Sequence, residues 1–263
     1  MSEIGKRLAE ERIELAFLPP ILCQLSLPRS RQEDGEFIRK SGDAWIVLQS
    51  GYLDLGNGPE RQPLPFGPMS RLILAYLCSY AIRFKTQEIP IGKNPSQFLR
   101  LIGIKGKDGR RFAKLYEQIK YFSACHLQYG RGGITHNPAP PVKTFINFGN
   151  WKEWPGKVIL SDEFYQSLQK SAVPLNLEVL LSLSGSALAM DVYIWLCHRL
   201  CQIQGNRPVI LRWKNLMDQF GQEYRGKEPT KDFKKKFLMA LHKVKGVYPS
   251  ARVEPVRRPP CFQ

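Results

Sequence analysis

The sequence lacks the features that would mark a secreted or membrane-spanning protein. Its 263 residues include only six cysteines, and their spacing shows no framework of the kind that disulfide-rich secreted domains use. No apolar run approaches the roughly 20 residues that a membrane-spanning helix needs. The first residues, MSEIGKRLAEERIELAF, mix charges throughout and have no signal-peptide core. We therefore expect a cytoplasmic protein whose thiols are reduced and largely buried.

Patterns that would indicate catalysis or cofactor binding are also missing. The four histidines are scattered and do not form the closely spaced metal-binding pair of rolling-circle nickases: His126, His136, His198 and His242. The stretch GQEYRGKE ends with Glu228, where a nucleotide-binding loop needs Ser or Thr. Cys197 and Cys201 lie one helical turn apart and could bind zinc, but no second ligand pair is nearby, which favours buried thiols. We expect no enzymatic activity, cofactor or metal.

Acidic residues are few, and the resulting positive charge is concentrated in two segments. The formal net charge is +16, from 39 Lys and Arg against 23 Asp and Glu. Residues 101–131 carry seven basic and two acidic residues, and residues 225–258 carry eleven basic and three acidic ones. Such a balance favours a polyanionic partner. Two separate basic segments indicate two binding surfaces rather than a general aid to solubility.

The order of predicted elements divides the chain into three parts: residues 1–62, 63–150 and 151–263. The first is an N-terminal extension, with a short amphipathic helix near Ile4 and strands around a KSGD turn. The second contains a helix, a short strand, a short helix, a turn, a basic helix and two strands that flank a loose loop, RGGITHNPAPP. That order is typical of a winged helix-turn-helix.

The third part repeats this order about 119 residues later, which indicates an internal duplication. YLC at Tyr76 precedes WLC at Trp195 by 119 residues, and Gly103 precedes Gly221 by 118. The stretch RPVILRW predicts the matching strand, and GVYPSARVEP predicts a strand of the second wing. A chance recurrence of helix, strand and helix is the alternative. We predict an α+β, mainly helical fold with two tandem winged-helix domains behind the extension.

The stretch KDFKKKFLMALHKVK, from Lys231 to Lys245, occupies the position of the second recognition helix. Phe233, Phe237 and Val244 recur at helical spacing and predict a buried face, so the lysines fall on the other side. A solvated surface helix is the simpler reading. Basic faces at matching places in both copies favour contact with nucleic acid. The candidate DNA-binding residues are Arg110, Arg111, Lys114, Lys120, Tyr121, Arg131, Lys231, Lys234, Lys235, His242 and Lys245.

Extended segments of the chain resemble the plasmid-encoded RepA family of replication initiators. In the first half they are LPFGPMSRLILAYLCSYAIRFKTQEIPIGKNPSQFLRLIGI and DGRRFAKLYEQIKYFSACHLQY. In the second half they are WPGKVILSDEFYQSLQKSAVPLNLEVLLSLSGSALAMDVYIWLCHRL and FKKKFLMALHKVKGVYPSARVE. The resemblance implies a protein that binds repeated sites in plasmid origin duplex DNA, helps to open it and recruits host initiation and helicase-loading proteins. It also implies a switch between monomer and homodimer.

One departure and three alternatives accompany this interpretation. After ARVE the family leads us to expect a strand that closes the second wing, but PVRRPPCFQ contains three prolines, and we expect that wing to be incomplete. The nearest alternative is a winged-helix transcriptional regulator, which uses the same chemistry. An RNA-binding protein would show aromatic residues clustered on a strand face. A membrane-surface protein would show a broad exposed apolar stripe, and neither pattern is found.

Overall fold

The computed structural model describes residues 15–54, 56–105, 109–145, 154, 156–203 and 208–256. The predicted helix near Ile4 lies outside these residues. The elements up to the middle of the chain are β1 (Leu15–Leu18), α2 (Pro20–Gln24), β2 (Glu36–Ser41), β3 (Ala44–Gln49), β4 (Tyr52–Asp54), β5 (Pro59–Arg61), α3 (Gly67–Phe84), β6 (Glu88–Pro90), α4 (Pro95–Leu101), α5 (Gly109–Ala124), β7 (His126–Arg131) and β8 (Ile134–Ala139). The remaining elements are β9 (Val142–Phe145), β10 (Lys157–Leu160), α6 (Asp162–Lys170), β11 (Val173–Asn176), α7 (Leu177–Ser182), α8 (Ala187–Leu200), α9 (Trp213–Phe220) and α10 (Pro229–Val247).

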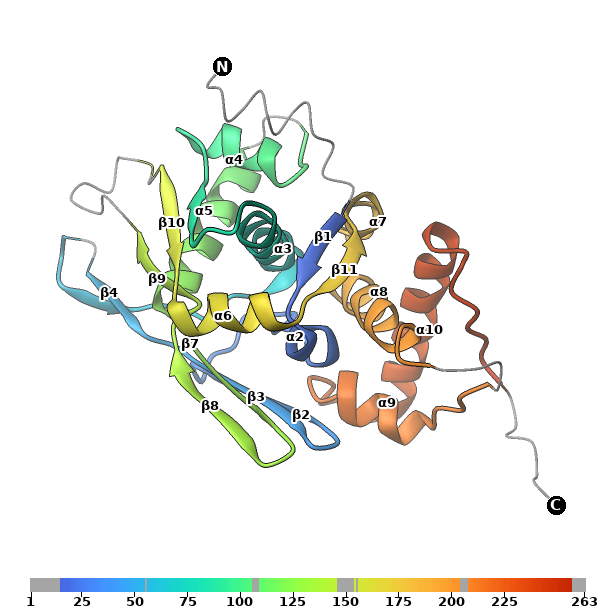
Figure 1. Cartoon of the computed structure of the whole chain (residues 1–263). Coiled ribbons are helices and arrows are strands. Elements are labelled where there is room, and N and C mark those ends of the chain that lie inside the picture. The colour runs from blue at the N-terminus through green and yellow to red at the C-terminus, as the bar shows by residue number, and fades with distance from the viewer. Residues whose placement is uncertain are drawn as a thin grey trace.

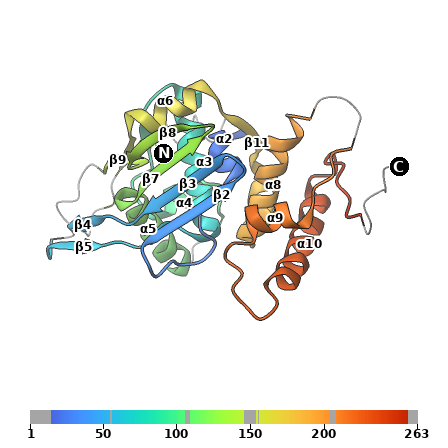
Figure 2. The same cartoon turned by 90° about the horizontal axis from the view of Figure 1, so that it is seen from below.

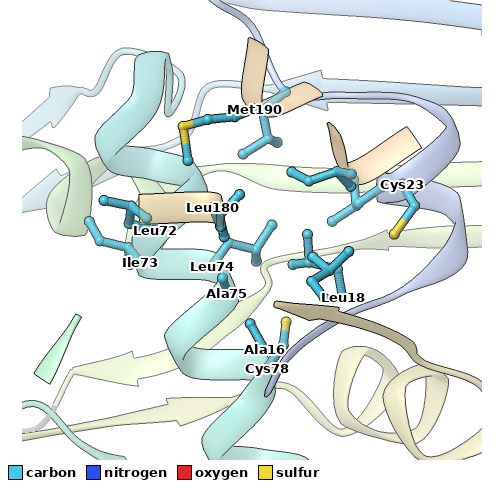
Figure 3. Close-up of a cluster of buried hydrophobic side chains, with 14 of the residues drawn as sticks. Ala16, Leu18, Cys23, Leu72, Ile73, Leu74, Ala75, Cys78, Leu180 and Met190 are labelled. Atoms are coloured by element: carbon cyan, nitrogen blue, oxygen red, sulfur yellow. The ribbon is translucent and has the colours of Figure 1, made fainter. Parts of the chain in front are cut away.

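Two long apolar helices, α3 and α8, form the centre of the molecule (Figure 1). Both are apolar on nearly every side, as expected of helices that are buried all round. Figure 3 shows Leu72, Leu74 and Cys78 of α3 beside side chains from β1 and α7, and Met190 of α8 lies in the same cluster. Each fully buried leucine of this kind stabilises the fold by about 2 kcal/mol. One continuous core therefore joins the two halves of the chain.

The two strands predicted to flank the loop after α5 do not pair with each other. The first is β7, and its partner is β8, which lies within the predicted loop; Gly132 and Gly133 at the turn between them both have positive φ angles. The second predicted strand corresponds to β9, which pairs with β10 in another sheet. β3 pairs with β7, and β2 pairs with β3, which gives an antiparallel sheet of order β2-β3-β7-β8 (Figure 2). Gly130 is required there, because a Cβ atom at this position would lie 2.6 Å from the ring of Trp45.

Other strand pairs cross both predicted domain boundaries. β10, which follows residue 150, pairs with β6 and β9 of the preceding part. β1 pairs with β11, so Leu15 lies opposite Asn176. The division at residues 62 and 150 stays a prediction, and each predicted part shares at least one sheet with another part.

The helices of the predicted repeat are confirmed, and its second set of strands is not. α8, α9 and α10 begin at residues 187, 213 and 229, which is 120, 118 and 120 residues after the starts of α3, α4 and α5 at 67, 95 and 109. Residues 208–212, predicted as a strand, are irregular, and so are residues 248–256 after α10. A strand needs a hydrogen-bonded partner, and Pro249 and Pro255 remove two backbone donors from the segment that would supply it.

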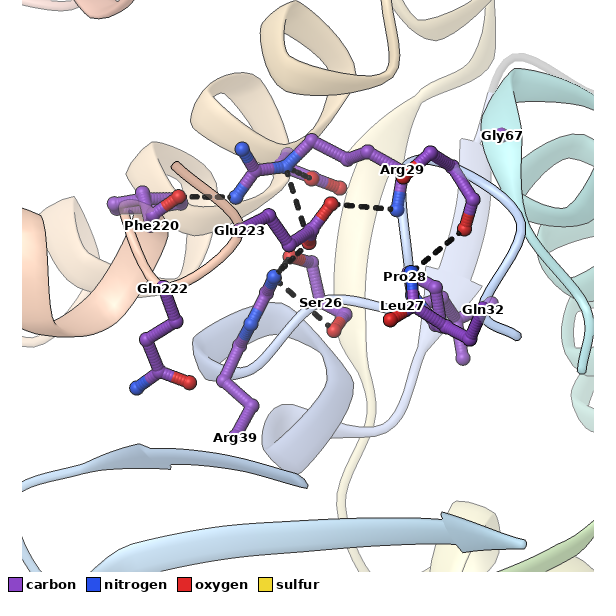
Figure 4. A network of polar contacts seen from close by, with 12 residues as sticks. Ser26, Leu27, Pro28, Arg29, Gln32, Arg39, Gly67, Phe220, Gln222 and Glu223 are labelled. Carbon is purple, nitrogen blue, oxygen red and sulfur yellow. Dashed lines mark hydrogen bonds and ion pairs between the residues drawn. The ribbon is translucent and has the colours of Figure 1, made fainter. Parts of the chain in front are cut away.

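A buried cluster of charged residues fixes the N-terminal segment against α3, α8 and the loop after α9 (Figure 4). Asp191 of α8 accepts from Arg71 of α3 at 2.6 Å and 2.9 Å, and from Arg29 Nε at 3.2 Å. Glu223, in the loop between α9 and α10, pairs with Arg39 of β2 and accepts from the backbone N–H of Arg29 at 3.3 Å. These five side chains join elements from both halves.

The guanidinium groups of this cluster are also bonded to backbone carbonyls. Arg71 donates to the carbonyl oxygens of Leu27, Pro28 and Gly67 at 2.7 Å, 3.1 Å and 2.8 Å. Burial and, to a smaller extent, the nearby charge of Arg29 lower the pKa of Arg39 to about 10, although Glu223 opposes the shift. Arg39 is therefore still charged at neutral pH, and the cluster holds three cations and two anions away from water.

We expect Asp191→Asn to destabilise the protein by about 3–5 kcal/mol, because it leaves the buried guanidinium groups of Arg71 and Arg29 without their counter-ion. Asp218→Asn is the matched control, since Asp218 is exposed on α9, and it should change stability by no more than about 0.5 kcal/mol. Urea denaturation followed by circular dichroism measures both. Equal midpoints for wild type and Asp191→Asn would show that the cluster does not contribute as described.

Candidate nucleic-acid interface

Helix α10 is held on the core by one apolar face, as the sequence predicts. Pro229 occupies its first turn, where no intrahelical donor is lost, and Asp232 lies near the positive end of the helix dipole. Phe233, Phe237 and Val244 are at most 3% exposed. The ring of Trp213 in α9 meets Phe237 edge-on, with centroids 6.0 Å apart. This aromatic packing fixes the rotation of α10 about its axis.

The opposite face of α10 presents most of the predicted basic residues to solvent. Lys231, Lys235, His242 and Lys245 are exposed. Lys231 Nζ lies 2.8 Å from a carboxylate oxygen of Glu228, and this exposed pair contributes little to stability.

Five residues of α10 differ from the prediction or were not part of it. Lys234 is half-buried, with its Nζ 5.6 Å from the centroid of the Trp213 ring, so its ammonium is partly engaged in a cation–π contact. Lys236 and Lys243 are exposed beside the predicted set. Leu238 and Met239, 37% and 51% exposed, lie among the lysines. Helical spacing alone would have placed all of these residues outside the buried face.

The predicted DNA-binding residues of α5 differ more in solvent exposure than those of α10. Arg110, Arg111 and Lys114 are exposed, and Arg111 donates to the backbone carbonyl of Lys105 at 2.9 Å. Lys120 is half-buried, and its Nζ lies 5.5 Å from the ring of Tyr116 in the preceding turn.

The prediction that Tyr121 lies on the outer side of α5 was wrong. Tyr121 is 7% exposed, and its ring stacks on Phe66 with centroids 6.3 Å apart. The segment that precedes α3 covers this side of α5, and the N–H of Phe66 donates to Gln118 at 2.8 Å. Tyr121 therefore has a packing role and cannot reach a base edge in this conformation.

The helices α5 and α10 lie far apart in the fold. Figures 1 and 2 both place them on opposite sides of the central helices α3 and α8. Arg131, at the tip of the β7–β8 hairpin, is exposed and lies 3.8 Å from Asp43 of the neighbouring β2–β3 turn. The predicted residues thus occupy three places: α5, the hairpin tip and α10.

The described residues contain no group of three or more His, Cys, Asp or Glu side chains that could hold a metal ion. Cys197 is buried and Cys201 is exposed. Burial raises the pKa of Cys197 to about 11, which disfavours the thiolate that zinc binding requires. Within the same part of the chain, no helix combines the length and the apolar character needed to cross a membrane.

Comparisons with known proteins identify one matching family and similar folds. A family model described as "Plasmid encoded RepA protein" matches residues 64–215, from just before α3 into α9. Two crystal structures of domains 2 and 3 of RctB are similar in fold at 12% sequence identity. The first has a TM-score of 0.55 and covers 86% of this chain and 84% of that one, and the second has 0.50, with 85% and 82%. No curated protein sequence matches significantly.

Substitutions on the two faces of α10 should have separate effects on stability. Phe237→Ala should lower the free energy of unfolding by about 3–5 kcal/mol, because it opens a cavity among Trp213, Phe220 and Phe233. Lys235→Ala, the control on the exposed face, should shift it by no more than about 0.5 kcal/mol. Thermal and urea melts of both variants give these values. Similar losses in the two variants would contradict the assigned rotation of the helix.

Proposed function

The chain belongs to the plasmid-encoded RepA family of replication initiators, and we propose that it binds repeated sequences in plasmid origin duplex DNA. In this proposal binding promotes opening of the origin and recruits host initiation and helicase-loading proteins, and the protein has no enzymatic activity of its own. The observation that carries the proposal is α10. Its rotation is fixed by buried aromatic residues, while lysines line its exposed face.

Two helical trios support a pair of winged-helix modules. In the first, α3, α4 and α5 are followed by the β7–β8 hairpin, which takes the place of a wing. In the second, α8, α9 and α10 have the same order without wing strands among the described residues. The third helix of such a trio enters the major groove in helix-turn-helix proteins, and this assigns groove contact to α5 and α10.

The exposed face of α10 combines groups for phosphate contact with groups for reading bases. Lys231, Lys235 and Lys245 suit phosphate oxygens, which position a protein on duplex DNA without reading its sequence. Leu238 and Met239 are exposed beside them, and apolar side chains can contact the methyl group of thymine in the major groove. A helix that only neutralised phosphates would not need the two apolar side chains.

The alternatives differ in what they require of this face. A membrane-surface helix would need its broad apolar face free, but in α10 Phe233, Phe237 and Leu241 are buried in the core. A transcriptional regulator would use the same contacts with DNA, and membership of the RepA family favours the initiator. A replication assay therefore separates these two functions better than a binding assay.

We expect the gene, together with its adjacent repeats, to let an otherwise non-replicating plasmid persist in a host. Transformants counted over many generations provide the measurement, with a plasmid that carries the repeats alone as the control. Purified protein should bind the repeats more tightly than random duplex of equal length. Specific binding without plasmid persistence would favour the regulator, and equal affinity for both duplexes would reject sequence-specific recognition.

The double substitution Lys235→Ala and Lys245→Ala should weaken binding to the repeats. The slope of log K against the logarithm of the salt concentration should become shallower by about two, if each lysine neutralises one phosphate. Lys93→Ala with Lys170→Ala is the matched control, because both residues are exposed and the change in net charge is the same. Fluorescence anisotropy between about 50 and 200 mM salt measures the slopes. An unchanged slope in the first variant, or equal losses in both, would mean that α10 is a solvated surface helix.

A further inference from the structure

A polar pocket lies where the β2–β3–β7–β8 sheet meets α8 and α9. Its volume is about 80 Å³, several times the roughly 10–15 Å³ that a single water requires. Ser41 and Arg131 line it from the sheet, His198 and Arg199 from α8, and Gln219 from α9. The pocket therefore lies between the first half of the chain and the second, beside the turn of the β7–β8 hairpin, where Arg131 is located.

The charged groups that line this pocket are all basic. Arg131 and Arg199 contribute guanidinium groups, and no carboxylate is among the lining side chains. The Nε atom of Arg199 is buried and has no hydrogen-bond partner among the described residues. Asp43 lies 3.8 Å from Arg131, but both side chains are more than half exposed, so this pair neutralises the pocket only weakly.

His198 is a buried imidazole in the lining of the same pocket. It is 8% exposed, and its pKa is lowered first by burial and then by Arg131 and Arg199. The imidazole is therefore held neutral, with its Nε2 atom 2.9 Å from Nε2 of Gln202. The lining of the pocket thus combines two guanidinium groups with an uncharged imidazole, and its positive potential favours an anion.

The amide side chains of the pocket are already oriented by the fold. Gln24 Nε2 donates to the carbonyl oxygen of Ser41 at 3.1 Å, and Gln219 Nε2 donates to that of Gln24 at 2.7 Å. Each amide nitrogen has a second N–H, and the hydroxyl of Ser41 is a further donor. These groups suit an acceptor that offers several oxygens, as a tetrahedral oxyanion does.

We propose that this pocket binds a phosphate group. Guanidinium groups favour phosphate, because they donate several hydrogen bonds in fixed directions. The phosphate belongs to a free phosphate ester or to the DNA backbone, and the pocket itself does not depend on the proposed function. Because the lining comes from the sheet, α8 and α9, an occupied pocket links the hairpin tip of the first half to the helices that support α10.

Inorganic phosphate is the probe, in thermal melts at constant ionic strength maintained with chloride. At about ten times its Kd, phosphate should raise the Tm of the full chain by about 3 °C relative to chloride alone. Arg199→Gln should abolish this rise, measured against the variant's own Tm in chloride. Arg100→Gln is the control, because Arg100 is exposed on α4, and it should keep the full rise.

Two outcomes would overturn the proposal. Equal Tm values in phosphate and chloride for the wild type would mean that the pocket holds water only. An equal rise in wild type, Arg199→Gln and Arg100→Gln would mean that phosphate binds elsewhere.

A second measurement identifies the source of the phosphate. If the DNA backbone supplies it, Arg199→Gln should reduce the salt slope of binding to the repeats by about one unit. An unchanged slope, together with the loss of the phosphate-dependent Tm rise, assigns the pocket to a free phosphate ester. A wild type that binds no DNA would overturn the proposed function and leave the phosphate pocket standing, because the melts contain no DNA.

Discussion

The buried pairing of Arg71 with Asp191 is the interaction on which the rest of the structure depends. Arg71 belongs to α3 and Asp191 to α8, and these helices are the centre of the first and second halves. Arg29, in the N-terminal segment, forms an ion pair with the same carboxylate of Asp191. Glu223 forms an ion pair with Arg39 of the sheet. Removing either carboxylate would leave buried guanidinium groups without a counter-ion, which is strongly destabilising. The sheet, the two central helices and the loop that precedes α10 therefore take up their positions together.

Most helices could be predicted, because the spacing of apolar residues and the capping residues that define a helix lie within its own stretch of sequence. The buried positions of α10 recur every three or four residues, and the outward direction of Lys235 and Lys245 follows from the same spacing. Asn94 and Pro95 mark the start of α4 in the sequence, and the Asn94 side chain accepts from the N–H of Gln97. The basic face of α10 was predictable for the same reason as the helix itself.

The errors and omissions arise from contacts between residues that are distant in the chain. Nothing near Tyr121 shows that Phe66 will cover it, so an aromatic residue beside lysines was read as exposed. Residues 208–212 have the composition of a strand but find no partner, and pairing decides whether a strand forms. The pocket between the sheet and α8 combines side chains from residues 24 to 219, and no spacing rule could have assembled it.

The pairing of β1 with β11 has a consequence for how the protein is made. The partner of Leu15 in the sheet, Asn176, is synthesised 161 residues later. The carboxylates that pair with Arg29 and Arg39 belong to residues 191 and 223 and are also synthesised late. Since ribosomes add about 5–20 residues per second, the N-terminal strand remains without its partner for on the order of ten seconds. During synthesis its apolar residues and unpaired edge are open to other chains.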